Sequence, residues 1–562
     1  MKKTSYFVFA IAVLVILSVF NSCDFGLGEF NSSNESNANV ELNDNKNDTS
    51  NTDSIDSPSD DTDTEITSDT QHPDVLPPEA EVDPEVYQYL EFTSNGDGTC
   101  TLTSIGDYIA DHLVIPATNS QGETVTKIGY SALSETNFRI VTIPEGVETI
   151  LGYAFYECKA LEIICIPNTV KSISTYAFHG CNNIKEVHIT DMTAWMKMDL
   201  PEADGNPFSG GTMLYLNGKP IIDLVIPDDA IRINDFVFSG YEYLQSISTT
   251  QNSKLSYIGE EAFSSCPRLM RVVLPQRLTT IKEKAFYNCL RLIEVVNLSS
   301  LEITKSNING YVGYYSIRIE NDGAENSRLI NKGDFVFYRD EDAYLLVAYF
   351  GDDDELVLPL DFEGKDYAIN KYFYSSSDVT QITVSNGVNR IGDYAFANKS
   401  KLKNVIFESE SQLKYIDESA FSQCGLESIV IPSTVEIIGV GAFEKCANLE
   451  SVSFKENSKL EAIRGQAFYN CPKLNNIIIP ATVKYIGVRA LSACSDLKSV
   501  TFEDPKGWNG IEGSGSYSVA ETLNENALGD SSRAATMVNG KGKYTLFKGT
   551  AEELLEFIKI FN

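Results

Sequence analysis

A phrase of about 23 residues recurs through most of this chain. One copy reads "IPEGVETILGYAFYECKALEIICIP" from Ile143, and the next reads "IPNTVKSISTYAFHGCNNIKEVHI" from Ile166. The shared pattern, I-P-x-x-V-x-x-I-x-x-x-A-F-x-x-C-x-x-L-x-x-V-x-I, has a Phe or Leu marker in each of twelve copies: Leu133, Phe155, Phe178, Phe238, Phe263, Phe286, Phe373, Phe396, Phe421, Phe443, Phe468 and Leu491. Neighbouring markers are 22, 23 or 25 residues apart except at two interruptions. This fixed period predicts a solenoid of stacked coils.

The pattern also predicts how each coil is built. Its last part, L-x-x-V-x-I, alternates as a strand does, and the Pro that follows ends the strand because it lacks an N–H donor. The Ala-Phe pair falls in a short turn on the far side, where Ala leaves room and Phe fills the space between coils. One coil buries too little apolar surface to offset the entropy of ordering its residues. We therefore expect one elongated stack in which every coil depends on its neighbours.

The repeated phrase resembles the treponemal-type leucine-rich repeat, and a chain built from it behind an export signal is similar to the BspA-like bacterial surface proteins. The match runs over about residues 87–503. The resemblance implies a mainly β fold, a curved leucine-rich-repeat solenoid with short turns or 3-10 segments on the far side. It also implies attachment to host matrix proteins such as fibronectin and fibrinogen, to epithelial cells or to other bacteria. No catalytic or binding residues come with the motif.

Two stretches interrupt the repeat, and both are predicted to be hairpin inserts. In the first, Asn217-Gly218 is typical of a tight hairpin turn. The second holds aromatic strands beside an acidic turn. Such inserts lie at an edge of a solenoid, where they either pack on the stack as extra hairpins or carry binding.

Both ends of the repeat array are predicted to be capped. Tyr87 to Leu102 is predicted to form a hairpin around Gly96-Asp97-Gly98, and Thr550 opens a capping box before an amphipathic helix. The helix would cover the last coil, or alternatively bind a partner. The expected organisation is a signal peptide at 1–22, a disordered acidic tether at 23–86, an N-terminal cap and first repeats at 87–190, an insert at 191–220, repeats at 221–298, an insert at 299–355, repeats at 356–503, and a C-terminal cap at 504–562 with a helix at 551–561.

The N-terminus has the parts of an export signal. Lys2 and Lys3 precede an apolar run from Phe7 to Phe20, which is too short to span a bilayer. The run ends just before Cys23, as in the bacterial lipoprotein signal, so the resemblance implies lipidation of Cys23; ordinary cleavage and a retained anchor are the alternatives. Residues 24–85 carry 18 Asp and Glu against one Lys. They cannot bury enough apolar surface to fold, so a tether is expected.

Eight of the eleven cysteines occupy one repeat position: Cys158, Cys181, Cys266, Cys289, Cys424, Cys446, Cys471 and Cys494. A Cys at one internal position behaves as a small buried hydrophobe, so we expect a ladder of free thiols. Disulfides between neighbouring coils are an alternative, because the coil spacing approaches the usual Cα separation. A zinc site is not expected, since there is no C-x-x-C and only four His are scattered along the chain.

The net charge and the motifs narrow the range of possible functions. With 44 Lys and Arg against 79 Asp and Glu, the net charge of −35 argues against nucleic-acid binding. No phosphate-binding loop and no H-E-x-x-H occur, so neither catalysis nor a cofactor is expected. The outward strand positions form a row of small polar and aliphatic side chains: Glu186 and His188, Arg271 and Val273, Glu294 and Val296, Gln381 and Thr383, Asn404 and Ile406, Ser428 and Val430, Ser451 and Ser453, Asn476 and Ile478.

Such a row suits contact with a broad surface better than a reaction. Our hypothesis is an envelope protein, anchored by lipid and exposed at the outer surface, that acts as an adhesin for a host matrix protein, a glycan or another cell. A structural envelope protein with no host ligand is the alternative. The candidate ligand contacts are Glu186, His188, Arg271, Val273, Glu294, Gln381, Asn404 and Asn476.

Overall fold

The structure is a computed structural model, and it describes residues 81–208, 211–321, 327–340, 343–375, 378–512, 521–522, 534–535 and 544–549. All of these lie in one compact unit of the chain. The predicted signal segment, Cys23, most of the acidic tether and the helix at 551–561 lie outside the described residues. The fold begins slightly before the predicted boundary at residue 87. The 3-10 helix η1 (Pro84–Gln88) is capped by the Asp83 side chain and buries Val86.

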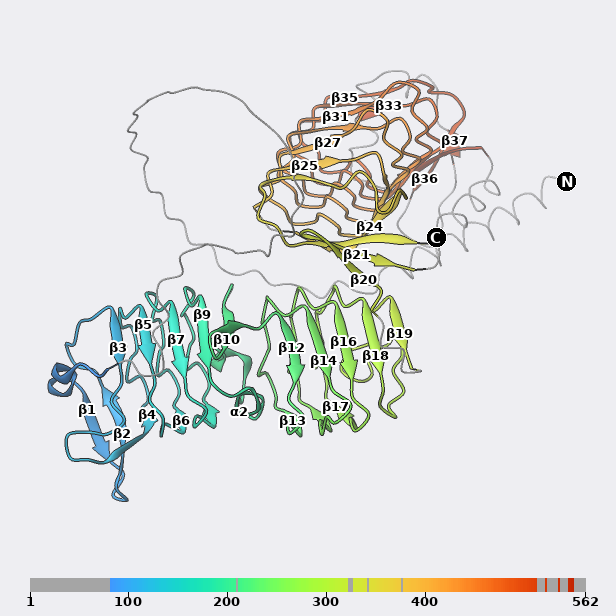
Figure 1. The fold of residues 1–562 in the computed structure, drawn as a ribbon. Helices are drawn as coiled ribbons and strands as arrows, with labels where there is room; N and C mark the ends of the chain where they lie inside the picture. The colour runs from blue at the N-terminus through green and yellow to red at the C-terminus, as the bar shows by residue number, and fades with distance from the viewer. Residues whose placement is uncertain are drawn as a thin grey trace, which may run out of the picture. The chain divides into compact units, whose positions relative to one another are not determined.

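Each coil contributes a long strand and a short strand, and strands of one kind from successive coils pair in parallel (Figure 1). In the first coils the long strands are β3 (His112–Val114), β5 (Ile140–Thr142), β7 (Ile163–Ile166) and β9 (Glu186–Ile189). The short-strand side consists of β4 (Thr124–Ile128), β6 (Thr149–Ile150) and β8 (Ser172–Ile173). The register advances by one repeat at each step, so that Ile140 lies beside Ile163. The predicted solenoid of parallel strands is therefore confirmed.

The same arrangement continues after each interruption. The middle coils have the long strands β12 (Asp223–Ile226), β14 (Ser246–Thr249), β16 (Arg271–Leu274), β18 (Glu294–Asn297) and β19 (Arg318–Glu320), with the short strands β13 (Arg232–Ile233), β15 (Tyr257–Ile258) and β17 (Thr280–Ile281). The last coils have the long strands β23 (Glu355–Val357), β25 (Gln381–Val384), β27 (Asn404–Phe407), β29 (Ser428–Ile431), β31 (Ser451–Phe454), β33 (Asn476–Ile479) and β35 (Ser499–Phe502). Their second sheet contains β24 (Tyr367–Tyr374), β26 (Val388–Ile391), β28 (Tyr415–Ile416), β30 (Ile437–Ile438), β32 (Ala462–Ile463) and β34 (Tyr485–Ile486).

The marker Phe residues stack on one another inside the coils, as the pattern predicts. The ring centroids of Phe155 and Phe178 are 4.9 Å apart, and those of Phe443 and Phe468 are 5.2 Å apart, with nearly parallel planes in both pairs. These rings are buried, and the Ala before each Phe is buried beside it. The stack provides offset aromatic contacts in addition to the burial of apolar surface, and it links each coil to the next.

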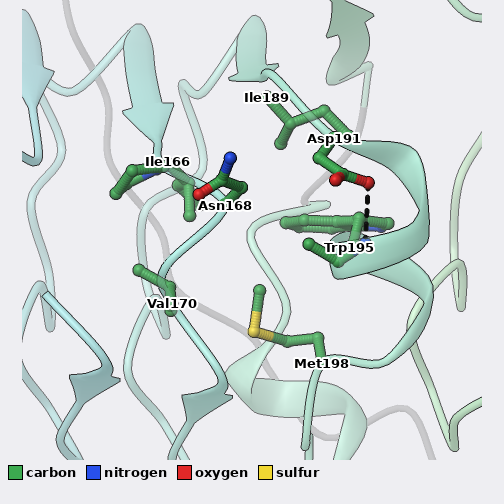
Figure 2. Close-up of a pocket in the computed structure, with 9 residues that line it drawn as sticks. Ile166, Asn168, Val170, Ile189, Asp191, Trp195 and Met198 are labelled. Atoms are coloured by element: carbon green, nitrogen blue, oxygen red, sulfur yellow. Dashed lines mark hydrogen bonds between the residues drawn. The ribbon is translucent and has the colours of Figure 1, made fainter. Parts of the chain in front are cut away.

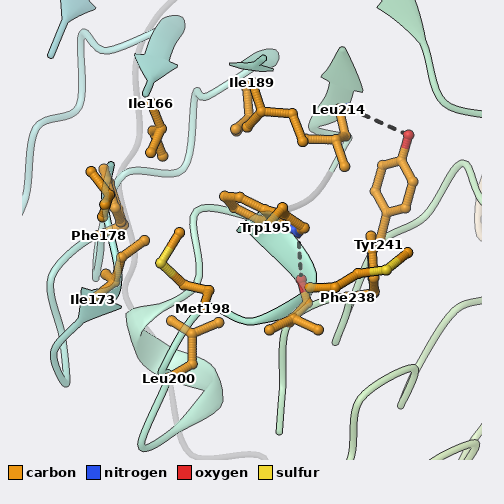
Figure 3. Packing of buried hydrophobic residues seen from close by; sticks show 14 of the residues in the cluster. Ile166, Ile173, Phe178, Ile189, Trp195, Met198, Leu200, Leu214, Phe238 and Tyr241 are labelled. Carbon is orange, nitrogen blue, oxygen red and sulfur yellow. Dashed lines mark hydrogen bonds between the residues drawn. The ribbon is translucent and has the colours of Figure 1, made fainter. Parts of the chain in front are cut away.

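The first insert is part of the core rather than a flap at the edge. Asp191 caps the short helix α2 (Met192–Met196), and the indole N–H of Trp195 donates to the carbonyl of Val237 at 3.2 Å. Trp195 lies among Ile189, Leu214 and Met198 (Figure 3). The predicted Asn217-Gly218 turn joins β10 (Met213–Leu216) to β11 (Lys219–Pro220) as expected. A hairpin was predicted here; the helix was not, and the 3-10 segment η2 (Ala203–Gly205) was also missed.

The second insert forms three antiparallel strands. These are β20 (Leu329–Lys332), β21 (Phe335–Arg339) and β22 (Tyr344–Tyr349). β22 then pairs in parallel with β24, which starts the second sheet of the last coils. Val336, Tyr338 and Ala348 of this insert pack with Met270 and Ile293 of the middle coils in a separate small core. The insert thus covers part of the middle coils.

Two arginines of the middle coils also contact the segment around β24. The Arg268 guanidinium lies 4.4 Å from the ring centroid of Tyr243 and 4.8 Å from that of Tyr374. The Arg291 guanidinium lies 5.1 Å from the Tyr374 centroid, and burial lowers the pKa of Arg291 to about 10. These cation–π contacts stabilise the connection between the middle and last coils.

Antiparallel strands cover both ends of the described coils. At the front, β1 (Glu91–Ser94) and β2 (Thr99–Ser104) form the predicted hairpin, and β2 pairs with β4. At the back, β38 (Tyr544–Lys548) pairs with β34 and with β36 (Trp508–Glu512), which in turn pairs with β37 (Glu521–Thr522). Covering an end in this way satisfies backbone groups that would otherwise present an open edge.

Candidate functional site

The long strands of the last coils present a regular outward surface, here called the strand face. It comprises the outward side chains of β23, β25, β27, β29, β31, β33 and β35. Because strand side chains alternate, each strand places two residues on it. Within each of the two sheets that these strands form, β23-β25-β27 and β29-β31-β33-β35, the register aligns these residues into two rows. The polar row is Glu355, Gln381, Asn404, Ser428, Ser451, Asn476 and Ser499, and the aliphatic and hydroxyl row is Val357, Thr383, Ile406, Val430, Ser453, Ile478 and Thr501.

The strand face is open to solvent. Val357 is 60% exposed, Ile406 and Val430 are each 47% exposed, and Ile478 is 52% exposed. The residues between them on each strand, such as Ile429 and Val452, point inward and are buried. Large aliphatic side chains in a row, beside amides and hydroxyls and with Glu355 as the one charged member, are typical of a surface that contacts another macromolecule.

Charged residues border the strand face instead of lying on it. Each occupies the position just before a strand, and Lys403 pairs with Glu427 at 3.7 Å. Glu450 and Lys498 take the same position in later coils and are exposed. The border therefore carries both signs of charge, and a rim of this kind around an apolar strip is the usual anatomy of a protein contact surface.

Three of the predicted contact residues lie on the strand face. Asn404 and Asn476 are exposed, and Gln381 is partly exposed, with its amide donating to Glu355 at 3.4 Å. Their predicted outward orientation is confirmed, whereas their contact with a ligand stays a prediction.

Two of the three predicted contacts in the middle coils are buried, and the third, Arg271, is only partly exposed. Glu294 is 1% exposed and Val273 is 6% exposed, so the expectation that they face solvent is wrong. The Glu294 carboxylate pairs with Arg271 and with Arg318, each at 3.4 Å, and accepts the backbone N–H of Arg328 at 2.8 Å. The physical reason is the second insert, which brings residues 327–328 against this carboxylate and covers the neighbouring Met270 and Ile293.

Glu186 and His188 in the first coils are also buried, at 7% and 9% exposure. The His188 Nε2 lies 2.7 Å from a Glu186 carboxylate oxygen, and the imidazole stacks on the ring of Tyr215 at 4.7 Å. Tyr215 belongs to β10 of the first insert, which extends the same sheet beyond β9. The prediction that these two residues are exposed contacts is therefore wrong, because the insert adds a strand with a large aromatic side chain beside them.

The repeat cysteines form a ladder of thiols that hydrogen-bond one coil to the next. All ten cysteines of the described residues are free thiols, and each of the eight repeat cysteines donates its S–H to the carbonyl of the marker residue one coil earlier. The distance is 2.9 Å from Cys158 to the Leu133 oxygen and 3.2 Å from Cys494 to the Phe468 oxygen. Burial raises the pKa of Cys446 to about 12 and that of Cys494 to about 11, so these groups are protonated and poorly nucleophilic at neutral pH.

A small cavity beside α2 offers no reactive group. Its interior volume is about 10 Å³, room for about one water molecule, and its lining includes Ile166, Ile189, Trp195 and Met198 (Figure 2). The carboxylate of Asp191 lies at its edge but already accepts the backbone N–H of Ala194 at 3.0 Å. The lining is therefore mixed, with Asn168 and Asp191 beside the apolar side chains, and its one carboxylate already caps α2.

The described residues contain neither a cluster of metal-ligating side chains nor a membrane-spanning helix. Within these residues, His, Cys, Asp and Glu nowhere gather in a group of three or more that could hold a metal ion. Also within them, no helix is long and apolar enough to cross a membrane.

The sequence contains a signal for the covered region. The position just before each long strand is charged or polar in most coils, for example Arg139, Lys403 and Glu450. Before β16, β18 and β19 of the middle coils the same position holds Met270, Ile293 and Ile317, all of which pack against the second insert. Apolar residues at a position that is otherwise polar indicate a covering segment.

Comparison with known proteins identifies the repeat. The profile of a family described as "BspA type Leucine rich repeat region" matches in six copies, over residues 99–197, 213–325 and 367–498, which is more than half of the chain. No curated protein matches the sequence.

Solved structures of similar fold come from several bacteria. A leucine rich cell surface protein from Faecalibacterium prausnitzii is 19% identical, with 76% of this chain and 96% of that chain covered and a TM-score of 0.27. A leucine-rich repeat protein from Bacteroides ovatus is 18% identical, with 76% and 100% covered and a TM-score of 0.25. The pneumococcal vaccine antigen PcpA is 18% identical, with 74% and 80% covered and a TM-score of 0.23. At these scores the structures add no argument about function.

Proposed function

The chain belongs to the BspA-type leucine-rich-repeat family, and from this premise we propose that it is a bacterial surface protein that binds a macromolecule through the strand face. The observation that carries the proposal is the exposure of that face along seven strands, partial at Gln381, Thr383 and Ser499, with four large aliphatic side chains in one row. Burying such a row against a partner releases ordered water from apolar surface, and the polar row beside it supplies hydrogen-bonding groups.

The more specific part of the proposal is that the protein is an adhesin. Its ligand would be a host matrix protein, a glycan or another bacterium, and the N-terminal Cys23 would carry the lipid that anchors the chain at the outer surface. Support comes from the export-type segment before Cys23 and from the acidic stretch after it, which would hold the solenoid away from the membrane. Catalysis has no part in this proposal.

The binding proposal is tested with the purified full chain on immobilised fibronectin, fibrinogen and a glycan array. The variant Ile406→Ser, Val430→Ser, Ile478→Ser removes three of the four large aliphatic side chains of the row. We expect it to bind its ligand at least about tenfold more weakly, since each side chain contributes apolar burial. A matched control, Ile109→Ser, Ile231→Ser, Ile308→Ser, removes aliphatic side chains elsewhere that are at least as exposed, and it should bind as the parent does.

Two results would count against the proposal. If the parent chain binds none of these ligands saturably, the adhesin function is rejected. If it binds but the two triple variants behave alike, binding does not use the strand face. The anchoring proposal is separate, and it predicts incorporation of a labelled fatty acid by cells expressing the parent but not the Cys23→Ala variant.

A further inference from the structure

A row of aromatic side chains lies in the turns of the first coils, away from the long strands. It consists of Tyr130, Tyr153, Tyr156, Tyr176 and His179, and it is here called the aromatic ridge. The ring centroid of Tyr153 is 5.2 Å from that of Tyr130 and 5.3 Å from that of Tyr176. Three successive coils therefore each contribute a tyrosine, and the middle ring contacts the rings on both sides of it.

The ridge is two rings wide and accessible. Tyr156 contacts Tyr153 at 5.4 Å and stacks on His179 at 5.7 Å with an interplanar angle of 9°. Tyr130 is 66% exposed, His179 is exposed, and the other three rings are partly exposed. The rings are thus held by their neighbours but present faces and edges to solvent.

The backbone does not explain why tyrosine occupies these positions. Tyr153 and Tyr176 have φ values of 59° and 58°, in the left-handed region that bulky side chains seldom adopt. The same conformation recurs two residues before later markers, at the bulky Phe236 and Tyr394 as well as at Ser419, Gly441 and Gln466. The left-handed conformation is therefore a general feature of the coil that residues of any size adopt, and it does not require tyrosine at Tyr153 and Tyr176.

Two acidic residues, Glu135 and Glu157, belong to the same turns as the ridge. The backbone N–H of Glu135 donates to the carbonyl of Tyr156, and that of Glu157 donates to the carbonyl of His179, each at 2.8 Å. Glu135 is exposed, and Glu157 pairs with the exposed Lys159 at 2.9 Å. Aromatic faces beside carboxylates form an environment that favours a cation.

Elsewhere in this protein, tyrosines on the coils already hold such a cation. Guanidinium groups lie over Tyr243, Tyr257 and Tyr415 at 4.4, 4.7 and 5.2 Å from the ring centroids. Over the ridge rings the described residues place no Arg or Lys at comparable distance. The ridge therefore resembles the protein's own arginine–tyrosine contacts with the arginine missing.

We propose that the aromatic ridge binds an arginine-rich segment of a partner protein, with guanidinium groups stacked on Tyr153 and Tyr176 and paired with Glu135 and Glu157. Arginine fits better than lysine because its planar, weakly hydrated guanidinium stacks on aromatic faces. The acidic charge of the chain as a whole would also attract a basic segment. This surface is separate from the strand face, and neither proposal depends on the other.

The test uses the full chain and three synthetic decapeptides that alternate Gly with Arg, Lys or citrulline. Binding is measured by calorimetry and by the tyrosine fluorescence of the protein. We expect the Arg peptide to bind more tightly than the Lys peptide and the citrulline peptide to bind weakly. The double variant Tyr153→Leu, Tyr176→Leu should weaken Arg-peptide binding about tenfold, because two cation–π contacts are lost.

Further variants distinguish the loss of the aromatic ring faces from a general loss of folding. Tyr153→Phe with Tyr176→Phe keeps the aromatic faces and should bind within about twofold of the parent. Glu135→Gln with Glu157→Gln should weaken binding and reduce its dependence on salt. The matched control Tyr469→Leu removes a tyrosine from the turn of a later coil and should leave binding unchanged.

The proposal is overturned if the Arg and Lys peptides bind equally, or if the Leu and Phe double variants lose the same affinity. It is also overturned if an uncharged oligosaccharide, and not the Arg peptide, protects the ridge tyrosines. None of these results would affect the strand-face proposal, which is tested with different variants and ligands.

Discussion

The outward sides of the middle and last coils carry the same repeat in opposite environments. In the last coils, Val430 and Ile478 are about half exposed and the strand face is open. In β16 and β18 of the middle coils, Val273 and Val296 occupy the equivalent strand positions and are 6% and 1% exposed, whereas Val225 in β12 is 57% exposed. A β-solenoid therefore does not have one outer face with one role. Segments that interrupt the repeat decide which part of that face remains available for binding.

The interiors of the two regions do not differ in this way. Phe238 stacks on Phe263 at 5.1 Å in the middle coils, and Phe443 stacks on Phe468 at 5.2 Å in the last coils. Cys266 and Cys446 both donate to the carbonyl of a marker Phe one coil earlier. The coil is the same unit in both regions, and only its surroundings change.

The largest expected difference in stability concerns the first outward position of the long strand. Glu294→Ala should destabilise the middle coils by about 3–5 kcal/mol, because it leaves Arg271 and Arg318 close together without the buried carboxylate between them. Asn476→Ala, at the equivalent position of the strand face, should change stability by no more than about 0.5 kcal/mol. Hydrogen exchange of the β18 and β33 amides measures the local opening free energy. Equal effects in the two regions would contradict the burial difference.

A smaller difference in the free energy of opening is expected at the position just before each long strand. Ile293→Ala removes a side chain that is 2% exposed and packs with the second insert, so we expect a loss of about 2–5 kcal/mol in the free energy of opening for β18 and β21. Glu450→Ala at the same repeat position is exposed and should have an effect within about 0.5 kcal/mol. An unchanged exchange rate in β21 after Ile293→Ala would show that the insert does not depend on this contact.

The smallest expected effect should be shared by both regions. Burial raises the pKa of Cys266 and raises that of Cys446 to about 12, whereas an unfolded thiol titrates near about 8.5. Above about pH 8.5 the unfolded chain loses these protons first, so stability is complete below that pH and declines as pH rises toward the folded pKa. Each thiol contributes up to about 1.4 kcal/mol per pH unit.

Urea midpoints measured from pH 8 to pH 10 test this effect. Cys266→Ala and Cys446→Ala should each make the decline less steep, and by similar amounts, because the two thiols occupy equivalent positions. Tyrosine ionisation affects parent and variants alike and cancels in the comparison. A flatter curve for only one variant would mean that the two interiors are not equivalent.

Much of the fold could be predicted because the repeat is local. The alternation around Val452 and Ile477, the position of each marker Phe and the shared position of the cysteines all follow from contacts between neighbouring coils. The Asn217-Gly218 hairpin could be predicted for the same reason, since a two-residue turn depends on its own residues. The helix α2 escaped prediction because it has only five residues, and its stability comes from burying Trp195 rather than from helical periodicity.

The candidate site was predicted only in part. The row through Gln381, Asn404 and Asn476 has the predicted orientation, whereas Glu186, His188, Val273 and Glu294 are buried. Their repeat positions are correct, but the strands that lie over or beside them come from elsewhere in the chain. The aromatic ridge was not predicted, because its rings come from turn positions outside the apolar pattern.

By itself, the sequence determined the coil: its two strands, its Phe stack and its buried thiols repeat because each coil satisfies its apolar groups against the next one. Only the tertiary structure decided which outward side chains remain in water. Met270 and Ile293 meet Val336 and Ala348 across a gap in sequence of more than 40 residues. A contact of that kind depends on where an insert packs, and no period in the sequence specifies it.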